Sequence, residues 1–204
     1  MNNLLSSTWT FLGEYARIAL MAIFLQNTIF TRALGSSTSL LLIRKKSNLP
    51  LFGFIIIIMT TLSSFGVYMV SDFISSFEFA EYIRPVSYIL AIAISYLILL
   101  LIVSLSRSLR KKLLPIIHMS AFNCAILGAL LLGTQQHMML TQFLGFGIGS
   151  GLGFVLATAL ISVAYDKLYN EDIPASFRGF PVTLIYIGIL SLAFYGLTGH
   201  ELPF

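Results

Sequence analysis

The chain has 204 residues, of which 57% are hydrophobic and only 10% are charged. So few charged side chains cannot cover the surface of a soluble globule of this size. The net charge of +4 sits in short clusters between apolar segments, which is typical of membrane topology and not of a nucleic-acid interface. Because about 20 apolar residues cross a bilayer as a helix, the composition predicts an all-α protein whose partner is the lipid bilayer, with no nucleic acid bound and no room for a soluble catalytic domain.

Six apolar segments follow one another along the chain and predict six transmembrane helices. They cover residues 11–34, 51–73, 86–106, 113–132, 139–165 and 180–197. The first ten residues lack the basic region of a signal peptide, so we expect the first segment to be retained. The expected organisation is one integral membrane domain over 1–204, made of a repeat over about 11–106 and a second over about 113–199.

Polar residues interrupt the first and the fourth segments. In the first, the run Gly35–Ser39 separates the main apolar stretch from Leu40–Ile43, and in the fourth Asn123 and Cys124 stand in an otherwise apolar run. Interruptions at matching places in two halves indicate an inverted repeat with a site near the middle of the membrane. We therefore predict two inverted three-helix repeats, with helices one and four broken or spanning only half the membrane.

The basic residues between the segments predict the side of the membrane that each loop faces. The loops after the first, third and fifth segments hold Arg44–Lys46, Arg107–Lys112, and Lys167 with Arg178, whereas the opposite loops hold only Arg84. Since cytoplasmic loops are enriched in Lys and Arg, we expect both termini on the non-cytoplasmic side.

Three polar residues inside the apolar segments are candidate functional residues. Asn27 and Asn123 carry amides that need partners in lipid, so each either joins two helices or lines a path for an ion or an electron. Cys124 is the single cysteine, which excludes an internal disulfide, and a lone membrane cysteine is most often a packing residue. A thiolate metal site would need ligands from another chain.

Glycines are concentrated in the fifth segment. Gly145, Gly149 and Gly153 repeat at every fourth residue, which predicts close packing against another helix. The run lacks the third glycine of the dinucleotide-binding pattern, and no strand precedes it. The sequence also lacks H-E-x-x-H and C-x-x-C motifs, so nothing indicates an active site belonging to this chain alone.

Several ordered motifs resemble the membrane subunits of the Rnf and Na⁺-translocating NADH:quinone oxidoreductase complexes. They are Asn27 with Arg32–Gly35, Tyr82–Arg84, Asn123–Gly128, Asp172–Gly179 and Leu190–Gly196. The resemblance implies a six-helix inverted repeat paired with a homologous six-helix subunit of opposite orientation, in the inner membrane of a prokaryotic cell. It also implies a larger complex that couples NADH, ferredoxin or quinone redox chemistry to Na⁺ or H⁺ transport, in which this chain is not catalytic alone.

The resemblance further implies a [2Fe–2S] cluster held between two subunits, each supplying two cysteines. Cys124 matches one of these positions, whereas Ser37 stands where the family has the other. A serine hydroxyl is a harder and less acidic ligand than a thiolate. Three outcomes stay open: a cluster with Ser37 or another group as a ligand, a cluster of altered potential, or no cluster. In the last case the chain is a paralogue acting as a transporter or a structural membrane subunit.

Overall fold

The computed structural model describes residues 2–44, 48–105, 107–136, 138–168 and 170–198, with side chains from Gly13 onward except at positions 72, 107, 108, 166, 197 and 198. This part of the chain contains only helices and their connections, which confirms the all-α prediction. The helices are α1 (Asn2–Ile23), α2 (Thr28–Arg32), α3 (Ser36–Arg44), α4 (Leu49–Ser75), α5 (Ala80–Ser104), α6 (Arg107–Ala121), α7 (Cys124–Gln135), α8 (Leu140–Leu168) and α9 (Phe180–Thr198). Lys45 and Lys46, which contributed to the predicted topology, lie outside the described residues.

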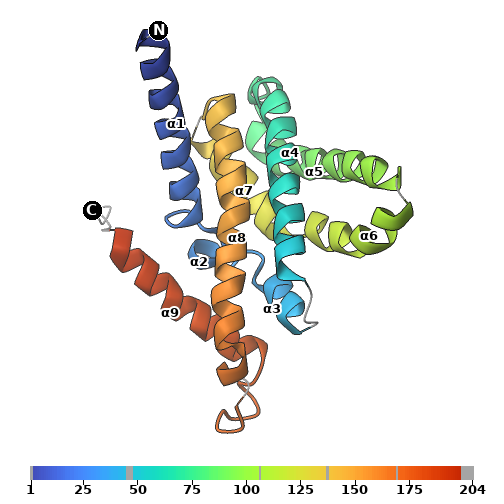
Figure 1. Cartoon of the computed structure of the whole chain (residues 1–204), viewed down its shortest axis with the longest axis vertical. Coiled ribbons are helices and arrows are strands. Elements are labelled where there is room, and N and C mark those ends of the chain that lie inside the picture. Colours follow the sequence, from blue (N-terminus) through green and yellow to red (C-terminus); the bar gives the residue numbers. More distant parts are fainter. Residues whose placement is uncertain (1, 45–47, 106, 137, 169, 199–204) are drawn as a thin grey trace.

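Helix α8 is the centre of the fold, with α1 and α4 packed along it (Figure 1). Its glycines explain how both neighbours come so close. A Cβ atom on Gly149 would lie 2.6 Å from the Ala19 carbonyl oxygen of α1, and one on Gly147 would lie 2.6 Å from Ser64 Oγ of α4. The predicted packing role of the glycines is confirmed. They allow close packing on two faces of α8, one against α1 and the other against α4.

Hydrogen bonds between buried hydroxyl and carbonyl groups add to these contacts. Thr60 Oγ1 of α4 donates to the Gly147 carbonyl oxygen at 2.9 Å, and Ser39 Oγ of α3 lies 2.8 Å from Thr158 Oγ1 of α8. Lipid supplies no partners for buried polar groups, so such pairs fix which helices lie together.

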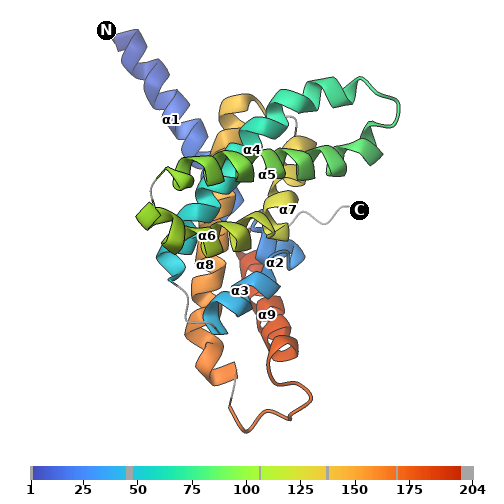
Figure 2. The same ribbon diagram turned by 90° about the vertical axis from the view of Figure 1, so that its right-hand side faces the viewer.

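Two parts of the molecule extend from this centre. Helices α5 and α6 run side by side away from α8, and α9 slants away from its lower end (Figure 1). In Figure 2, which faces this side of the molecule, α5 and α6 lie in front of α4 and α8. Helix α9 is held to the rest by aromatic packing, with the rings of Phe30 and Phe194 stacked 4.4 Å apart. The Ser191 hydroxyl also donates to the Phe30 carbonyl oxygen.

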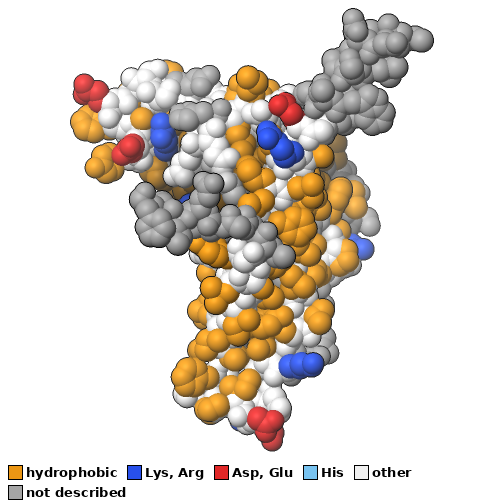
Figure 3. Space-filling view, turned by 90° about the vertical axis from the view of Figure 1, so that its left-hand side faces the viewer, with side chains coloured by type: hydrophobic (Ala, Val, Ile, Leu, Met, Phe, Trp, Pro, Cys, Tyr) orange, Lys and Arg blue, Asp and Glu red, His pale blue; other side chains and the backbone are white. Residues whose placement is uncertain are grey.

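Three described helices are long and apolar enough to cross a membrane. They cover Leu49–Ser71, Ala80–Ser104 and Leu140–Tyr165, and two bent helix pairs raise the number to five if each pair is one span. The apolar part of α9, Phe180–Gly196, is shorter than these. Hydrophobic side chains cover most of the middle of the face in Figure 3, while the acidic side chains in view lie near its ends. The fold is therefore that of a multi-pass membrane protein, and the count of six spans stays a prediction.

Both interrupted segments are broken in the structure, one of them differently from expectation. The chain bends by 52° at residues 122–123, between α6 and α7, as the sequence predicts. In the first segment only Gly35 of the run Gly35–Ser39 lies in a break, because Ser36–Ser39 belong to α3. The chain is instead interrupted at residues 24–27 and 33–35, and α3 turns by 89° from the helices before it. The left-handed backbone of Ala33 (φ 56°) and Gly35 (φ 84°) makes this turn.

Candidate functional site

The first break is built around Asn27. Its side-chain oxygen accepts hydrogen bonds from the backbone N–H groups of Ile29 (3.0 Å) and Phe30 (3.4 Å), which caps α2. Its side-chain nitrogen donates to the carbonyl oxygens of Ile23 (2.9 Å) and Gly153 (2.8 Å). The fully buried amide therefore ties together the end of α1, the start of α2 and the middle of α8.

The second break is built around Asn123 in a similar way. Its side-chain oxygen accepts from the backbone N–H of Ala125 at 3.0 Å and caps α7. Its side-chain nitrogen is buried and has no hydrogen-bond partner among the described residues. A buried donor without a partner is costly, so the amide of Asn123 retains an unused hydrogen-bonding group, whereas the amide of Asn27 has none.

The two breaks meet at Gly35 and Cys124. The backbone N–H of Gly35 donates to Cys124 Sγ at a distance of 3.1 Å. A Cβ atom on Gly35 would lie 2.9 Å from the side-chain oxygen of Asn123 and 2.8 Å from the ring of Phe154. Both the positive φ angle and this close approach require glycine at position 35. Segments 89 residues apart are thus joined at the thiol.

Cys124 and Ser37 occupy corresponding places at the two breaks. Cys124 is the first residue of α7 and Ser37 is the second residue of α3, and both are exposed on the isolated chain. Cys124 also lines a cavity of about 260 Å³, together with Tyr96, Phe122 and Asn123. The structure brings Cys124 to Gly35, two residues before Ser37, so both candidate ligands lie in segments that meet.

The donor set is insufficient for a metal centre within one chain. Among the described residues, no three His, Cys, Asp or Glu side chains are grouped to hold a metal ion. A [2Fe–2S] cluster takes four ligands, usually thiolates, and this site offers one thiol and one hydroxyl. The backbone N–H of Gly35 that points at Cys124 Sγ fits a ligand sulfur, because hydrogen bonds to the sulfurs tune such clusters. The residues therefore fit part of a site shared with another chain.

The sequence proposes four candidate residues, and the structure adds the partners of three of them, which the sequence does not indicate. Asn27 and Asn123 were expected near a membrane site, yet nothing in the sequence pairs Asn27 with the Gly153 carbonyl oxygen. Gly35 was part of a motif, and its role as donor to Cys124 follows only from the meeting of the breaks. The Tyr96 hydroxyl lies 2.6 Å from His118 Nδ1, a pair with no sequence signal because 22 residues separate its members.

Interrupted spans whose breaks meet inside an apolar helical chain are typical of membrane transport proteins. The chain matches the family described as Rnf-Nqr subunit, membrane protein, over residues 15–200, and it belongs to this family. The matched residues include both helix breaks.

Similar proteins are named as the A component of an ion-translocating oxidoreductase complex. The protein of this name from Glaesserella parasuis serovar 5 is 29% identical over 187 residues, which cover 91% of this chain and 97% of the relative. Relatives with the same name from Vibrio cholerae serotype O1 and Pasteurella multocida are each 28% identical, with the same coverage of both chains. These similarities extend over nearly the whole length of each protein.

Proposed function

We propose that this chain is the A-type membrane component of an ion-translocating oxidoreductase complex. Membership of the Rnf-Nqr family and the shared name of its relatives support this function. In such a complex the chain would take part in coupling the oxidation of NADH or ferredoxin, or quinone chemistry, to the movement of Na⁺ or H⁺. It would work with other subunits of that complex, as the names of its relatives indicate.

The proposed architecture is a six-helix inverted repeat paired with a homologous subunit of opposite orientation. Its support is that each break holds an asparagine that caps a helix. Cys124 directly follows Asn123, and Ser37 lies in α3, the helix after the one that Asn27 caps. The positions of Arg44, Lys111 and Arg178 support a topology with both termini outside the cytoplasm of a prokaryotic inner membrane. Labelling of cysteines introduced at Lys111 and Arg178 tests this topology, because both must react only from the cytoplasmic side.

We propose that Cys124 holds a [2Fe–2S] cluster shared with the partner subunit, and that Ser37 takes the second position on this chain. When bound, the cluster would supply one-electron transfer across the subunit interface. The observation that carries this proposal is the hydrogen bond from the Gly35 backbone to Cys124 Sγ, which holds the thiol at an exposed junction of the two breaks.

The two asparagines would have different tasks beside this site. Asn27 uses both ends of its amide within the chain, which favours joining helices over lining a path. The unpaired nitrogen of Asn123 lies next to Cys124 and supports a role in lining the electron or ion path.

A second candidate function is a paralogue without a cluster, acting as a transporter or a structural membrane subunit. The observation that favours it is Ser37, because a serine replaces a thiolate at one of the two ligand positions.

The experiment that separates these functions is electron paramagnetic resonance of the reduced complex. The chain is purified with its partner subunits, reduced, and compared with the Cys124→Ala and Ser37→Cys variants. A cluster signal that disappears in Cys124→Ala and changes its g values in Ser37→Cys supports the proposed site. An intact complex that contains no iron leaves the paralogue without a cluster as the function.

A further inference from the structure

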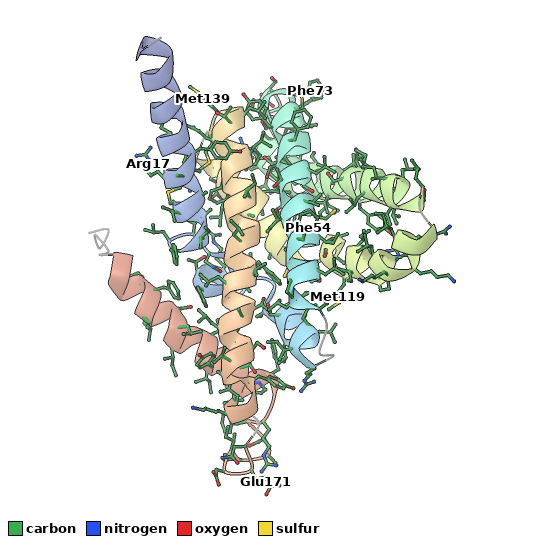
Figure 4. All side chains as sticks on the ribbon, in the orientation of Figure 1. Arg17, Phe54, Phe73, Met119, Met139 and Glu171 are labelled. Carbon is green, nitrogen blue, oxygen red and sulfur yellow. The ribbon has the colours of Figure 1, made fainter. Side chains whose placement is uncertain are left out.

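A second cavity, of about 380 Å³, lies at the end of the bundle where α4 ends and α5 begins. It shares no lining residue with the cavity beside Cys124. Figure 4 marks this end of the molecule with Phe73 on α4 and Met139 before α8. Its lining includes Tyr68, Ser71, Arg84, Tyr88 and Thr134. The volume falls within the range of small-molecule sites, roughly 300–1,000 Å³.

Arg84 is the charged residue of this cavity. Its side chain is half-buried, and no ion pair joins it to another side chain within the described part of the chain. An arginine that faces a cavity at the edge of an apolar span marks a binding site more often than a packing position. Its planar guanidinium group favours bidentate contacts with a phosphate or a carboxylate.

The neighbouring hydroxyl groups present acceptors to the cavity. Ser71 Oγ donates to the Tyr68 carbonyl oxygen at 3.0 Å, and Thr134 Oγ1 donates to the Leu130 carbonyl oxygen at 2.9 Å. Because their protons are used within the helices, their remaining lone pairs can accept from a ligand. The cavity therefore combines a cationic donor with neutral acceptors, an arrangement that matches a zwitterion better than a simple anion.

The surface around this end of the molecule is apolar, with acidic residues in the α4–α5 turn. Phe73, Tyr82 and Met139 are each more than two-thirds exposed. Such a surface favours contact with the acyl chains of a lipid, whereas a free anion has no apolar part that could contact it. Glu78 and Glu81 in or next to the turn are also exposed, and their charges disfavour a lipid with a net negative charge.

We propose that this cavity binds the headgroup of a zwitterionic phospholipid of the phosphatidylethanolamine class. The phosphate contacts the Arg84 guanidinium, and the ammonium group faces the oxygens of Ser71 and Thr134. The acyl chains lie along the exposed apolar surface of the α4–α5 end. This site does not depend on the proposed redox function.

Native mass spectrometry of the full chain, purified with its partner subunits and stripped of lipid by detergent, tests the proposal. Dioctanoyl phosphatidylethanolamine, dioctanoyl phosphatidylglycerol and inorganic phosphate are added separately. The wild type is expected to bind one molecule of the ethanolamine lipid per chain. Arg84→Gln is expected to weaken that binding about tenfold or more, the usual effect of losing a charge-assisted hydrogen bond.

Two further variants keep the test interpretable. Ser71→Leu retains Arg84 but fills the cavity, so this variant is also expected to lose lipid binding. It keeps the proposal testable if Arg84→Gln fails to fold. Arg17→Gln removes an exposed arginine of α1 outside the cavity and is expected to bind like the wild type.

Four results would overturn the proposal. In the first, the ethanolamine lipid binds equally to the wild type and to both cavity variants. In the second, phosphatidylglycerol binds as tightly as phosphatidylethanolamine. In the third, inorganic phosphate alone binds as tightly as the ethanolamine lipid, which identifies a free-anion site. Arg84→Gln releases a partner protein while lipid content stays unchanged, which identifies a protein carboxylate as the ligand.

Discussion

The two helix breaks use the same residue type with different results. Asn27 and Asn123 both cap a short helix through the side-chain oxygen. Asn27 also satisfies its nitrogen by bonding to α1 and α8, whereas the nitrogen of Asn123 is buried without a partner among the described residues. The amide of Asn27 is thus fully bonded within the chain, and the amide of Asn123 retains bonding capacity beside an exposed thiol. This difference agrees with the proposal that Cys124 and Asn123 line the functional site while Asn27 holds the helices together.

The largest effect is expected from Asn27→Ala. The substitution removes the buried hydrogen bond to the Gly153 carbonyl oxygen and leaves two N–H groups of α2 without their cap, so the free energy of unfolding should fall by about 3 kcal/mol or more. Unfolding in mixed detergent micelles measures it. The matched control is Asn48→Ala, which removes an exposed cap of α4 with one hydrogen bond of 3.3 Å and should cost about 1 kcal/mol or less. Equal decreases in the free energy of unfolding for the two variants would contradict the role of Asn27 in joining α1, α2 and α8.

Gly35→Ala is expected to rank next. An alanine would need a φ angle of 84° and would contact Asn123, Ala125 and Phe154 at less than 3 Å. Strain and overpacking together should lower the free energy of unfolding by about 2–3 kcal/mol, measured in the same micelles. Gly188→Ala is the control, since a Cβ atom on Gly188 has no neighbour within 4 Å and alanine favours the helix. A neutral Gly35→Ala would show that the breaks do not meet as closely as described.

Asn123→Ala should cost about 1 kcal/mol, clearly less than Asn27→Ala, because only one hydrogen bond is lost. The measurement is again the free energy of unfolding of the isolated chain. If the loss matched that of Asn27→Ala, the nitrogen of Asn123 would have a partner within the chain and the contrast between the breaks would disappear.

The smallest effect on stability is expected for Cys124→Ala. The side chain is exposed and accepts one weak hydrogen bond from Gly35, so the free energy of unfolding should change by about 0.5 kcal/mol or less. Thermal unfolding of the isolated chain checks this. A large loss would mean that Cys124 is a structural residue, and its substitution could not then test a ligand role.

The sequence predicted the helical membrane fold and the existence of both breaks. Both predictions depend on local features of the sequence, namely long apolar segments and polar residues that interrupt them. It placed the first break partly wrongly. Gly35 does lie in the turn, but the hydroxyl residues Ser36–Ser39, which indicated a polar interruption, are helical, and the turn also depends on the left-handed backbone of Ala33. It also gave Asn27 and Asn123 the same two alternatives. Their difference depends on whether a carbonyl of α8 comes within reach, which is a matter of tertiary packing.

The most direct test of a shared site is the reactivity of the native thiol at the junction of the two breaks. Cys124 is the only cysteine, so alkylation by N-ethylmaleimide followed by mass spectrometry reports on this position without any substitution. We expect one adduct per chain on the isolated protein and strong protection in the assembled complex, where a partner covers the site. Equal labelling rates in both forms would contradict a shared site at Cys124.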